Sequence, residues 1–377
     1  MTRGAYRITL SNGERIPIID ENRNLRIDEI RAPQTAGVFT GSYGANAYQG
    51  STSGFITGGG PNSPYANRAI IHKFPFASDT NSTDTGGDLL QWTSSASGSS
   101  SPTHGYVAGG YKGPTSSGSL TGAIEKYPFA ISSGTSSSVG SQATSKYYSR
   151  GASSDTHGYS VAGYQPGPVP KSIDIEKYSH SSDESATDVG DLYDVAEPRH
   201  GYISNSARNA GIAFISGGFS NPPSTGGLIS RIQKFPFSTD ENAVDTGGDL
   251  IGGLYVPGIG TYDAAGTVSP THAYVAGGTP PYAFNVDTIQ KFPFSISSGS
   301  ATDVGDLFFG YSGLKGISST THGYAVGGNA PYSVPPPYPY AGVNIIQKWS
   351  IASDANGTDV GDMIHAANNH PDPGHQV

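Results

Sequence analysis

The 377-residue chain has no cysteine, which excludes a disulfide framework and a thiolate metal site. Only 14% of its residues are charged, the formal net charge is −9, and no basic stripe is visible. Binding a phosphate backbone requires clustered Lys and Arg, so we expect no nucleic-acid partner. No apolar run approaches the roughly 20 residues of a membrane span, and the first residues lack the apolar centre of a signal peptide.

Leu and Glu are also scarce, whereas the chain contains 53 Gly and 27 Pro. Val, Ile, Tyr, Phe and Thr are common, and this mixture favours short strands joined by turns. Disorder is the alternative for such a composition, but 37 Phe and Tyr residues recur at regular intervals and oppose it. We therefore expect an all-β protein.

Two phrases recur along the chain. The first contains His, an aromatic residue and a pair of small residues: THGYVAGGY (103–111), THGYSVAGY (156–164), THAYVAGGT (271–279) and THGYAVGGN (321–329), with weaker copies at 53–59 and 212–218. The second reads IIHKFPF, AIEKYPF, DIEKYSH, RIQKFPF, TIQKFPF and IIQKWSI, and its lysines are 53, 51, 57, 57 and 57 residues apart. The chain is therefore built from six units of about 55 residues.

A third phrase, typified by ATDVGDL (186–192), closes five of the units, and the second unit has the degenerate SSVGSQ (137–142). With a small-residue stretch before the first phrase, each unit has four strand candidates separated by turn residues. Four strands per repeat predict a β-propeller blade. We expect a six-bladed propeller over 37–363, with blades near 37–92, 93–144, 145–192, 193–252, 253–307 and 308–363, and a tail at 364–377.

A strand that ends in a glycine pair at a period near 50 resembles the kelch repeat, although the downstream Tyr and Trp of the kelch pattern are largely missing. The combined phrase HGYVAGG … IQKFPF … ATDVGDL also resembles repeats in virion structural proteins of marine bacteriophages, particularly those of cyanobacteria. The resemblance covers roughly residues 37–363. It implies a kelch-like propeller that forms part of a tail, a fibre or a particle surface.

The repeated polar residues are expected to be structural. Histidines at one repeat position lie too far apart on different blades to share a metal, so a hydrogen bond that ties a turn is the preferred role. The lysines are expected to pack their stems on a neighbour, with the ammonium at the rim or paired to an aspartate. These residues are His104, His157, His272 and His322, and Lys73, Lys126, Lys177, Lys234, Lys291 and Lys348.

The aspartates of 78–88 and 353–362 superficially resemble calcium loops, and the first segment also contains the start of a sialidase Asp box. Turn capping by the Asp side chain explains the pattern more simply, because the second unit lacks these aspartates and still has its other phrases. We therefore expect no metal and no cofactor. We expect the first unit to supply all four of its strands within 37–89, so that no exchanged closing strand is required.

The sequences of the six units differ most after the glycine pair and at the unit boundaries, and proline and aromatic residues are concentrated there. Rigid loops of this kind suit a sugar ring or a protein partner, and the alternative is that the aromatic residues only pack their own loops. Candidate contact residues are Tyr65, Tyr111, Tyr164, Phe219, Tyr282, Tyr332, Tyr338 and Tyr340 in the loops, and Trp92, Tyr147, Tyr148, Tyr193, Tyr255, Phe308 and Phe309 at the boundaries.

Residues 1–36 lie outside the repeat and hold six Arg and five acidic residues. The stretch 5–10 alternates like a strand, and 11–18 reads as a turn into a second one. We interpret this segment as a docking arm to other virion proteins, or as a strand lent to a neighbouring subunit in a symmetric homo-oligomer. A short lid or a disordered tail is the alternative.

No sequence motif of a hydrolase, a zinc protease or a phosphate-binding loop is present. A copper oxidase on a kelch-like propeller would need a cysteine, and a sialidase would need an arginine cluster. We therefore expect a non-enzymatic virion component that contacts proteins or host-surface glycans, with a free carbohydrate-binding lectin as the alternative.

Overall fold

The computed structural model describes residues 7–9, 15–17, 50–58, 69–112, 119–165, 171–193, 201–219, 229–251, 261–279, 286–329, 342–367 and 374–376. The chain divides into two compact units, Met1–Ser42 and Tyr43–Val377. In the first unit, β1 (Arg7–Thr9) pairs antiparallel with β2 (Arg15–Pro17), where the sequence predicts a strand, a turn and a second strand.

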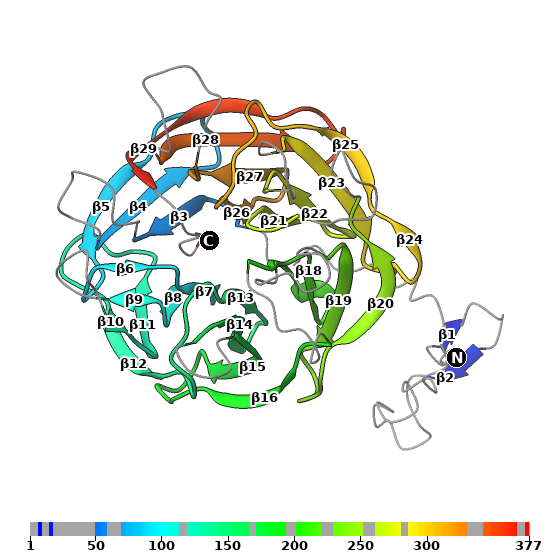
Figure 1. The fold of residues 1–377 in the computed structure, drawn as a ribbon, viewed down its shortest axis with the longest axis horizontal. Coiled ribbons are helices and arrows are strands. Elements are labelled where there is room, and N and C mark those ends of the chain that lie inside the picture. Colours follow the sequence, from blue (N-terminus) through cyan, green and yellow to red (C-terminus); the bar gives the residue numbers. More distant parts are fainter. Residues whose placement is uncertain are drawn as a thin grey trace, which may run out of the picture. The chain divides into compact units, whose positions relative to one another are not determined.

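The second unit is built from small antiparallel sheets, which confirms the expected all-β class. Five of these sheets have four antiparallel strands each, and a sixth has four antiparallel strands and a short fifth one; the six are numbered here in chain order (Figure 1). The innermost strands of sheets 1 to 6 are β30 (Gly374–Gln376), β7 (Ser97–Ser100), β13 (Arg150–Ser153), β17 (Ile203–Ala207), β21 (Ala265–Val268) and β26 (Lys315–Ser318). The second strands are β3 (Ser53–Thr57), β8 (His104–Ala108), β14 (His157–Tyr164), β18 (Ile212–Ser216), β22 (His272–Ala276) and β27 (His322–Val326).

The phrases that contain lysine form the third strands, and those of the TDVGD type form the outer strands. The third strands are β4 (Ile70–Pro75), β11 (Ala123–Pro128), β15 (Lys171–Ser179), β19 (Arg231–Pro236), β23 (Thr288–Pro293) and β28 (Val343–Ser350). The outer strands are β5 (Thr83–Asp88), β12 (Ser137–Ser141), β16 (Thr187–Asp191), β20 (Val244–Asp249), β25 (Thr302–Asp306) and β29 (Thr358–Ala367).

Three shorter features complete the described part of this unit. The strand β24 (Gly299–Ser300) pairs parallel with β20, and a one-turn helix η2 (Arg208–Ala210) follows β17. A small three-stranded sheet joins β6 (Thr93–Ser94), β9 (Tyr111–Lys112) and β10 (Ser119–Leu120) beside sheet 2.

Local chemistry explains where the strands end. In four sheets the third strand stops at the proline of the lysine phrase, because proline has no N–H for the ladder. Both residues of the pair after the second strand take a positive φ in the described copies, for example 72° at Gly109 and 84° at Gly110. Side chains disfavour this conformation, which is why glycine follows the second strand in most units.

The antiparallel order gives each sheet two edges. The turns from innermost to second strand and from third to outer strand lie at one edge, here called the hairpin edge. The connections from second to third strand, and from each sheet to the next, begin and end at the opposite edge, here called the crossover edge. Residues 101–104 therefore belong to the hairpin edge of sheet 2, and the described residues 109–112 and 119–122 belong to its crossover edge.

The sheets follow one another in chain order around a common centre, with β7, β13, β21 and β26 near the middle (Figure 1). The innermost strands touch in the cycle β7, β13, β17, β21, β26, β30 and back to β7. Small residues make this approach possible. A Cβ on Gly151 would lie 1.7 Å from the carbonyl oxygen of Gly98, and one on Gly316 would lie 2.0 Å from that of Gly266. The small-residue stretch of each unit is thus required at the centre.

A second cycle of contacts runs through the outer strands. The N–H of the residue before each outer strand donates to a carbonyl of the preceding sheet's outer strand, at 2.6–2.8 Å, and sheet 1 is joined to sheet 6 in the same way. The donor and acceptor pairs are Ser136–Asp88, Ala186–Ser141, Ala243–Asp191, Ala301–Asp249, Gly357–Asp306 and Ser82–Asp362.

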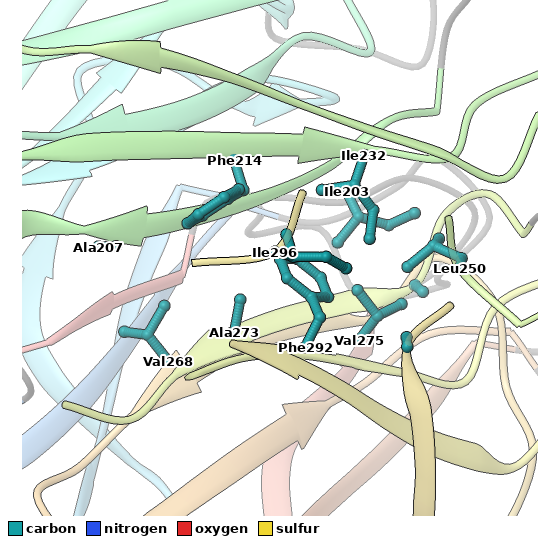
Figure 2. Close-up of a cluster of buried hydrophobic side chains, with 12 residues drawn as sticks. Ile203, Ala207, Phe214, Ile232, Leu250, Val268, Ala273, Val275, Phe292 and Ile296 are labelled. Atoms are coloured by element: carbon teal, nitrogen blue, oxygen red, sulfur yellow. The ribbon is translucent and has the colours of Figure 1, made fainter. Parts of the chain in front are cut away.

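Aromatic residues fill the seams between sheets. In five seams the ring of a second-strand residue packs on the ring that follows the third strand of the next sheet, with centroids 4.7–5.8 Å apart. The pairs are Phe55–Phe129, Tyr106–His180, Tyr159–Phe237, Phe214–Phe294 and Tyr324–Phe76. Figure 2 shows the apolar cluster around Phe214 and Phe292 that joins sheets 4 and 5. Each sheet therefore buries its apolar surface against its neighbours.

Sheet 1 corrects one expectation. Its innermost strand is β30, which pairs with β3 through the register of Phe55 with His375, so residues 37–89 do not supply all four strands. The other edge of β3 is taken by β4, which leaves no place beside β3 for a strand from upstream. The tail therefore completes sheet 1, because the inward edge of β3 must be paired.

Candidate functional site

The four repeated histidines lie in one kind of turn at the hairpin edge. In each turn a serine hydroxyl accepts the N–H of the histidine at 2.9–3.0 Å and the N–H of the preceding threonine at 3.3 Å. The threonine hydroxyl lies 2.8 Å from the histidine Nδ1. The turns are Ser101–His104, Ser154–His157, Ser269–His272 and Ser319–His322. These histidines therefore belong to a tight Ser-x-Thr-His turn.

The departures from this turn have visible causes. Sheet 1 has Ser53 at the histidine position and no such turn, since its innermost strand comes from the tail. Sheet 4 has Ile212 there, and η2 replaces the turn. Burial, together with the nearby Lys126, lowers the pKa of His104 below its ordinary value. The imidazole is therefore neutral at pH 7.

The lysines of the third strands reach across the seams. Four of them pair with an aspartate in the third-to-outer turn of the next sheet, for example Lys177 with Asp240 at 2.5 Å. The other pairs are Lys126–Asp183, Lys291–Asp354 and Lys348–Asp79. The ammonium of Lys73 instead lies 5.4 Å from the centre of the Phe55 ring. Sheet 2, which follows Lys73, has no aspartate in the corresponding turn, 130–136.

The aspartates of the third phrase cap the glycine two residues later. Their side chains accept its N–H at 2.7–3.2 Å, in the pairs Asp84–Gly86, Asp188–Gly190, Asp245–Gly247, Asp303–Gly305 and Asp359–Gly361. This is the side-chain turn that Asp is known to form. Within the described ranges, no three His, Asp or Glu side chains come together as metal ligands.

Sequence reasoning missed one buried position, the residue before each lysine of the third strand. A register shift occurs at this point in all six sheets. In sheets 2 to 6 the side chain accepts a backbone N–H from the connection that enters its own sheet. The residues are His72, Glu125, Glu176, Gln233, Gln290 and Gln347, all at most 4% exposed. The signal in the sequence was a polar residue at a fixed place in an apolar strand.

Two of these positions carry buried ion pairs. Glu125 accepts from Lys112 at 2.8 Å, and Glu176 accepts from Lys146 at 3.1 Å. Burial lowers the pKa of Lys112, and the neighbouring Glu125 opposes that shift. Sheets 4 to 6 place glutamine at the same position, so the charge is particular to sheets 2 and 3.

The structure describes part of the candidate contact residues, and those that it describes lie at the crossover edge. Tyr65, Tyr255, Tyr282, Tyr332, Tyr338 and Tyr340 lie outside the described residues. Of the rest, Phe219 stacks on Tyr262 with ring centres 5.2 Å apart. Phe308 is 54% exposed and packs against Phe309 at 4.5 Å, and Trp92 is half-buried just before β6.

Four tyrosines gather at the crossover edge between sheets 2 and 3. The ring of Tyr147 lies 4.6 Å from Tyr111, 4.8 Å from Tyr148 and 5.1 Å from Tyr164. The backbones of Tyr147 and Tyr164 exchange hydrogen bonds of 3.0 and 2.7 Å, and Tyr111 begins β9. All four side chains are half-buried, so this cluster, here called the tyrosine patch, presents aromatic surface to solvent.

A buried ion pair lies beside the tyrosine patch. The Arg150 guanidinium donates to Asp263 at 2.5 Å and also to the carbonyl of Tyr202, which links sheets 3, 4 and 5 near the centre. Asp263 also acts on Tyr148, since it adds to burial in raising the pKa of that hydroxyl. Arg150 and Asp263 are 113 residues apart and belong to no repeated phrase, so sequence reasoning had no signal for them.

A polar cavity of about 90 Å³ lies among the innermost strands and is lined mainly by their serine and glycine residues. Arg208 enters it from η2, and its guanidinium donates to the carbonyls of Ser153, at 3.1 Å, and Ser100. Serine hydroxyls also cross the seams, since the N–H of Ser153 donates to Ser206 at 3.0 Å. These groups satisfy the inward edges of strands that have no further strand to pair with.

No known family model matches the chain, and no curated protein matches it in sequence. The described part of the chain contains no helix with the length and hydropathy to span a bilayer.

Proposed function

We propose that Tyr43–Val377 forms a six-bladed β-propeller of the kelch-like type, each numbered sheet being one blade. Support comes from the three sets of contacts between neighbouring sheets: innermost strands, outer-strand hydrogen bonds and aromatic pairs. Each set includes a contact between sheet 6 and sheet 1. Tail residues in the innermost place of sheet 1 would hold the first and last blades together.

The protein is a non-enzymatic structural component of a virion, located in the extracellular particle. The observation that carries this proposal is the combined repeat phrase over 37–363, which resembles virion proteins of marine bacteriophages. The repeated His, Lys and Asp side chains are engaged in turns and seams, which is the expectation for a scaffold. The variable residues lie at the crossover edge, where a partner or a host-surface glycan would bind.

Residues 1–36 are the attachment segment in this proposal. The unit Met1–Ser42 is compact in its own right and contains the β1–β2 hairpin, and its six arginines can meet acidic partner surfaces. It would bind other virion proteins and arrange several copies symmetrically, with the propeller exposed for contact.

Particles purified from the source of the sequence test the proposal. We expect mass spectrometry to find the chain in the particles at a fixed copy number, and cryo-electron microscopy to show it in symmetric copies. A chain lacking residues 1–36 should fold, as judged by its circular dichroism and thermal unfolding, and fail to join the particle. Normal incorporation of the truncated chain would refute the attachment role.

A free carbohydrate-binding lectin is the second candidate, and the tyrosine patch favours it, because exposed aromatic rings suit sugar faces. The two candidates differ in a simple observation. A lectin would bind glycan as a soluble protein and be missing from purified particles.

A further inference from the structure

We propose that the tyrosine patch, together with the Arg150–Asp263 pair, is a binding site for one neutral sugar ring of a glycan. This inference rests on the proposed function and specifies the site and the chemistry of the contact. The patch offers four half-buried phenol rings with centres 4.6–5.1 Å apart around Tyr147. A pyranose has an apolar C–H face that packs on such rings and hydroxyls that hydrogen-bond at its rim.

The backbone at this site keeps large side chains where glycine would be easier. Tyr148 and Asp263 have φ values of 58° and 55°, Ser95 has 58° at the equivalent place of sheet 2, and the equivalent residues of sheets 4 and 6 are Gly201 and Gly313 at 70° and 66°. Side chains disfavour this conformation, and strained positions of this kind gather at ligand-binding sites. Tyr148 of sheet 3 and Asp263 of sheet 5, whose side chains a ligand would contact, therefore have a backbone conformation that glycine adopts more easily.

The electrostatics of the site favour a neutral ligand. Arg150 and Asp263 neutralise each other at 2.5 Å, so the pair offers polar atoms without net charge. Burial raises the pKa of the Tyr147 hydroxyl, and its hydrogen bond with Tyr111 adds to the rise. Both Tyr147 and Tyr148 therefore remain uncharged phenols at pH 7 and can donate to sugar hydroxyls.

Among the residues that the structure describes, the patch is particular to the seam between sheets 2 and 3. The matching place between sheets 4 and 5 holds Phe219 stacked on Tyr262. Phe308 and Phe309, at the boundary of sheets 5 and 6, have no hydroxyl. We therefore infer one sugar site for each copy of the chain rather than six equivalent ones.

Isothermal titration of the full chain with neutral oligosaccharides tests the inference, using probes that end in glucose, galactose or mannose. We expect binding by at least one probe and a loss of at least about tenfold in affinity for Tyr147→Ala, about 1.4 kcal/mol. Tyr148→Gly is the sharper variant, because glycine already occupies this place in sheets 4 and 6 and the fold should be kept. Ile364→Ala is the control, because Ile364 is an exposed apolar residue of β29 in sheet 6, and this variant should bind like the unchanged chain.

Three results would overturn the site: no neutral probe binds at about 10 mM, only acidic sugars bind, or the tyrosine variants bind a neutral probe as tightly as the unchanged chain. The last result would move glycan contact elsewhere on the chain. None of these measurements uses particles, so failure here is distinct from failure of the virion proposal, which particle association decides.

Discussion

Sheet 1 differs from the other five sheets in two respects: it takes its innermost strand from the tail, and it places His72 where the others have Glu or Gln. Like sheet 4, it also lacks the Ser-x-Thr-His turn. His72 faces His365 of β29, with ring centres 6.0 Å apart, and burial lowers its pKa to about 4. Sheet 1 is where the two ends of the repeat meet, so residues from sheets 1 and 6 replace what a single unit supplies elsewhere.

In the regular sheets, residues close in sequence join the innermost strand to the second. In sheet 1, the pairing of these two strands depends on residues far apart in sequence. In sheets 2, 3, 5 and 6, a turn of four residues joins the innermost strand to the second. In sheet 1 the innermost strand consists of the three residues of β30. One of them, His375, also contacts sheet 2, since its Nδ1 lies 2.9 Å from the carbonyl oxygen of Ser99. Sheet 1 should therefore be the least stable sheet of the proposed propeller.

Removing β30 should lower the stability of the protein more than any other change considered below. A chain ending at residue 373 loses the backbone pairing of three residues, worth about 1 kcal/mol each, and exposes Phe55 and Tyr127. We expect a loss on the order of 5 kcal/mol in unfolding free energy, measured by urea denaturation. Deleting residues 1–36 is the control and should leave the transition of the second unit unchanged. A truncated chain as stable as the full one would show that the pairing of β30 with β3 does not stabilise the protein.

The buried pair of sheet 2 offers a contrast among the regular sheets. Lys112→Met leaves Glu125 buried without its cation, and we expect a loss of about 3–5 kcal/mol in thermal or urea unfolding. Adding Glu125→Gln should restore most of it, because sheets 4 to 6 already carry glutamine at this position. If the double variant stays as unstable as Lys112→Met, the equivalence of the sheets at this position is wrong.

Acid should weaken sheet 1 through His375, whose ring is buried. Burial lowers the pKa of His375 to about 4, against 6.5 for an ordinary histidine. As the pH falls below about 6.5, the unfolded chain takes up a proton that the folded chain refuses until about pH 4. Up to about 3 kcal/mol of stability is therefore lost across this window.

Urea titrations at pH 7 and pH 4.5 measure this loss, with His375→Gln as the comparison. The variant keeps a side-chain donor and cannot titrate, so its stability should fall less steeply with pH. Equal slopes for the two proteins would assign the pH dependence to other groups.

The repeated turn can be tested in sheet 5. Ser269→Ala removes the hydroxyl that accepts the N–H of Thr271 and His272, and we expect a loss of about 1–2 kcal/mol. His272→Ala should cost less than about 1 kcal/mol, because the half-buried ring bonds only its neighbouring threonine. Thermal unfolding of both variants decides the order, and a larger effect of the histidine would give it a role beyond the turn.

The smallest expected effect is a gain. Ala162 has a φ of 54° where the other units have glycine. Ala162→Gly should relieve this strain and raise the unfolding free energy by about 1 kcal/mol, whereas the same change at Ala152, in β13, should lower it. Differential scanning calorimetry of the two variants provides the comparison.

Strands and turns could be predicted from the sequence where their determinants are local. Proline ends the third strand, the glycine pair ends the second, and Asp caps the turn of the outer strand, each within a few residues. The strand β30 could not be predicted, because Gly374–Gln376 has no apolar alternation and becomes a strand only where β3 offers an edge. An indirect signal existed, since the first unit alone lacks both the turn and its histidine without any replacement.

The candidate site was predictable only in part for the same reason. The sequence indicated that aromatic residues gather where the units differ, and Tyr111, Tyr147, Tyr148 and Tyr164 were among them. It did not indicate that these four meet at one seam, because they come from two units and from different ends of their strands.

By itself, the sequence determined the all-β class, the six units and the residues that brace each turn, because these depend on contacts within about ten residues. Only the tertiary structure decided that β30 completes sheet 1 and that Arg150 meets Asp263. Each of these requires an edge or a charge brought close by the packing of several sheets, and no local pattern encodes which distant segment arrives there.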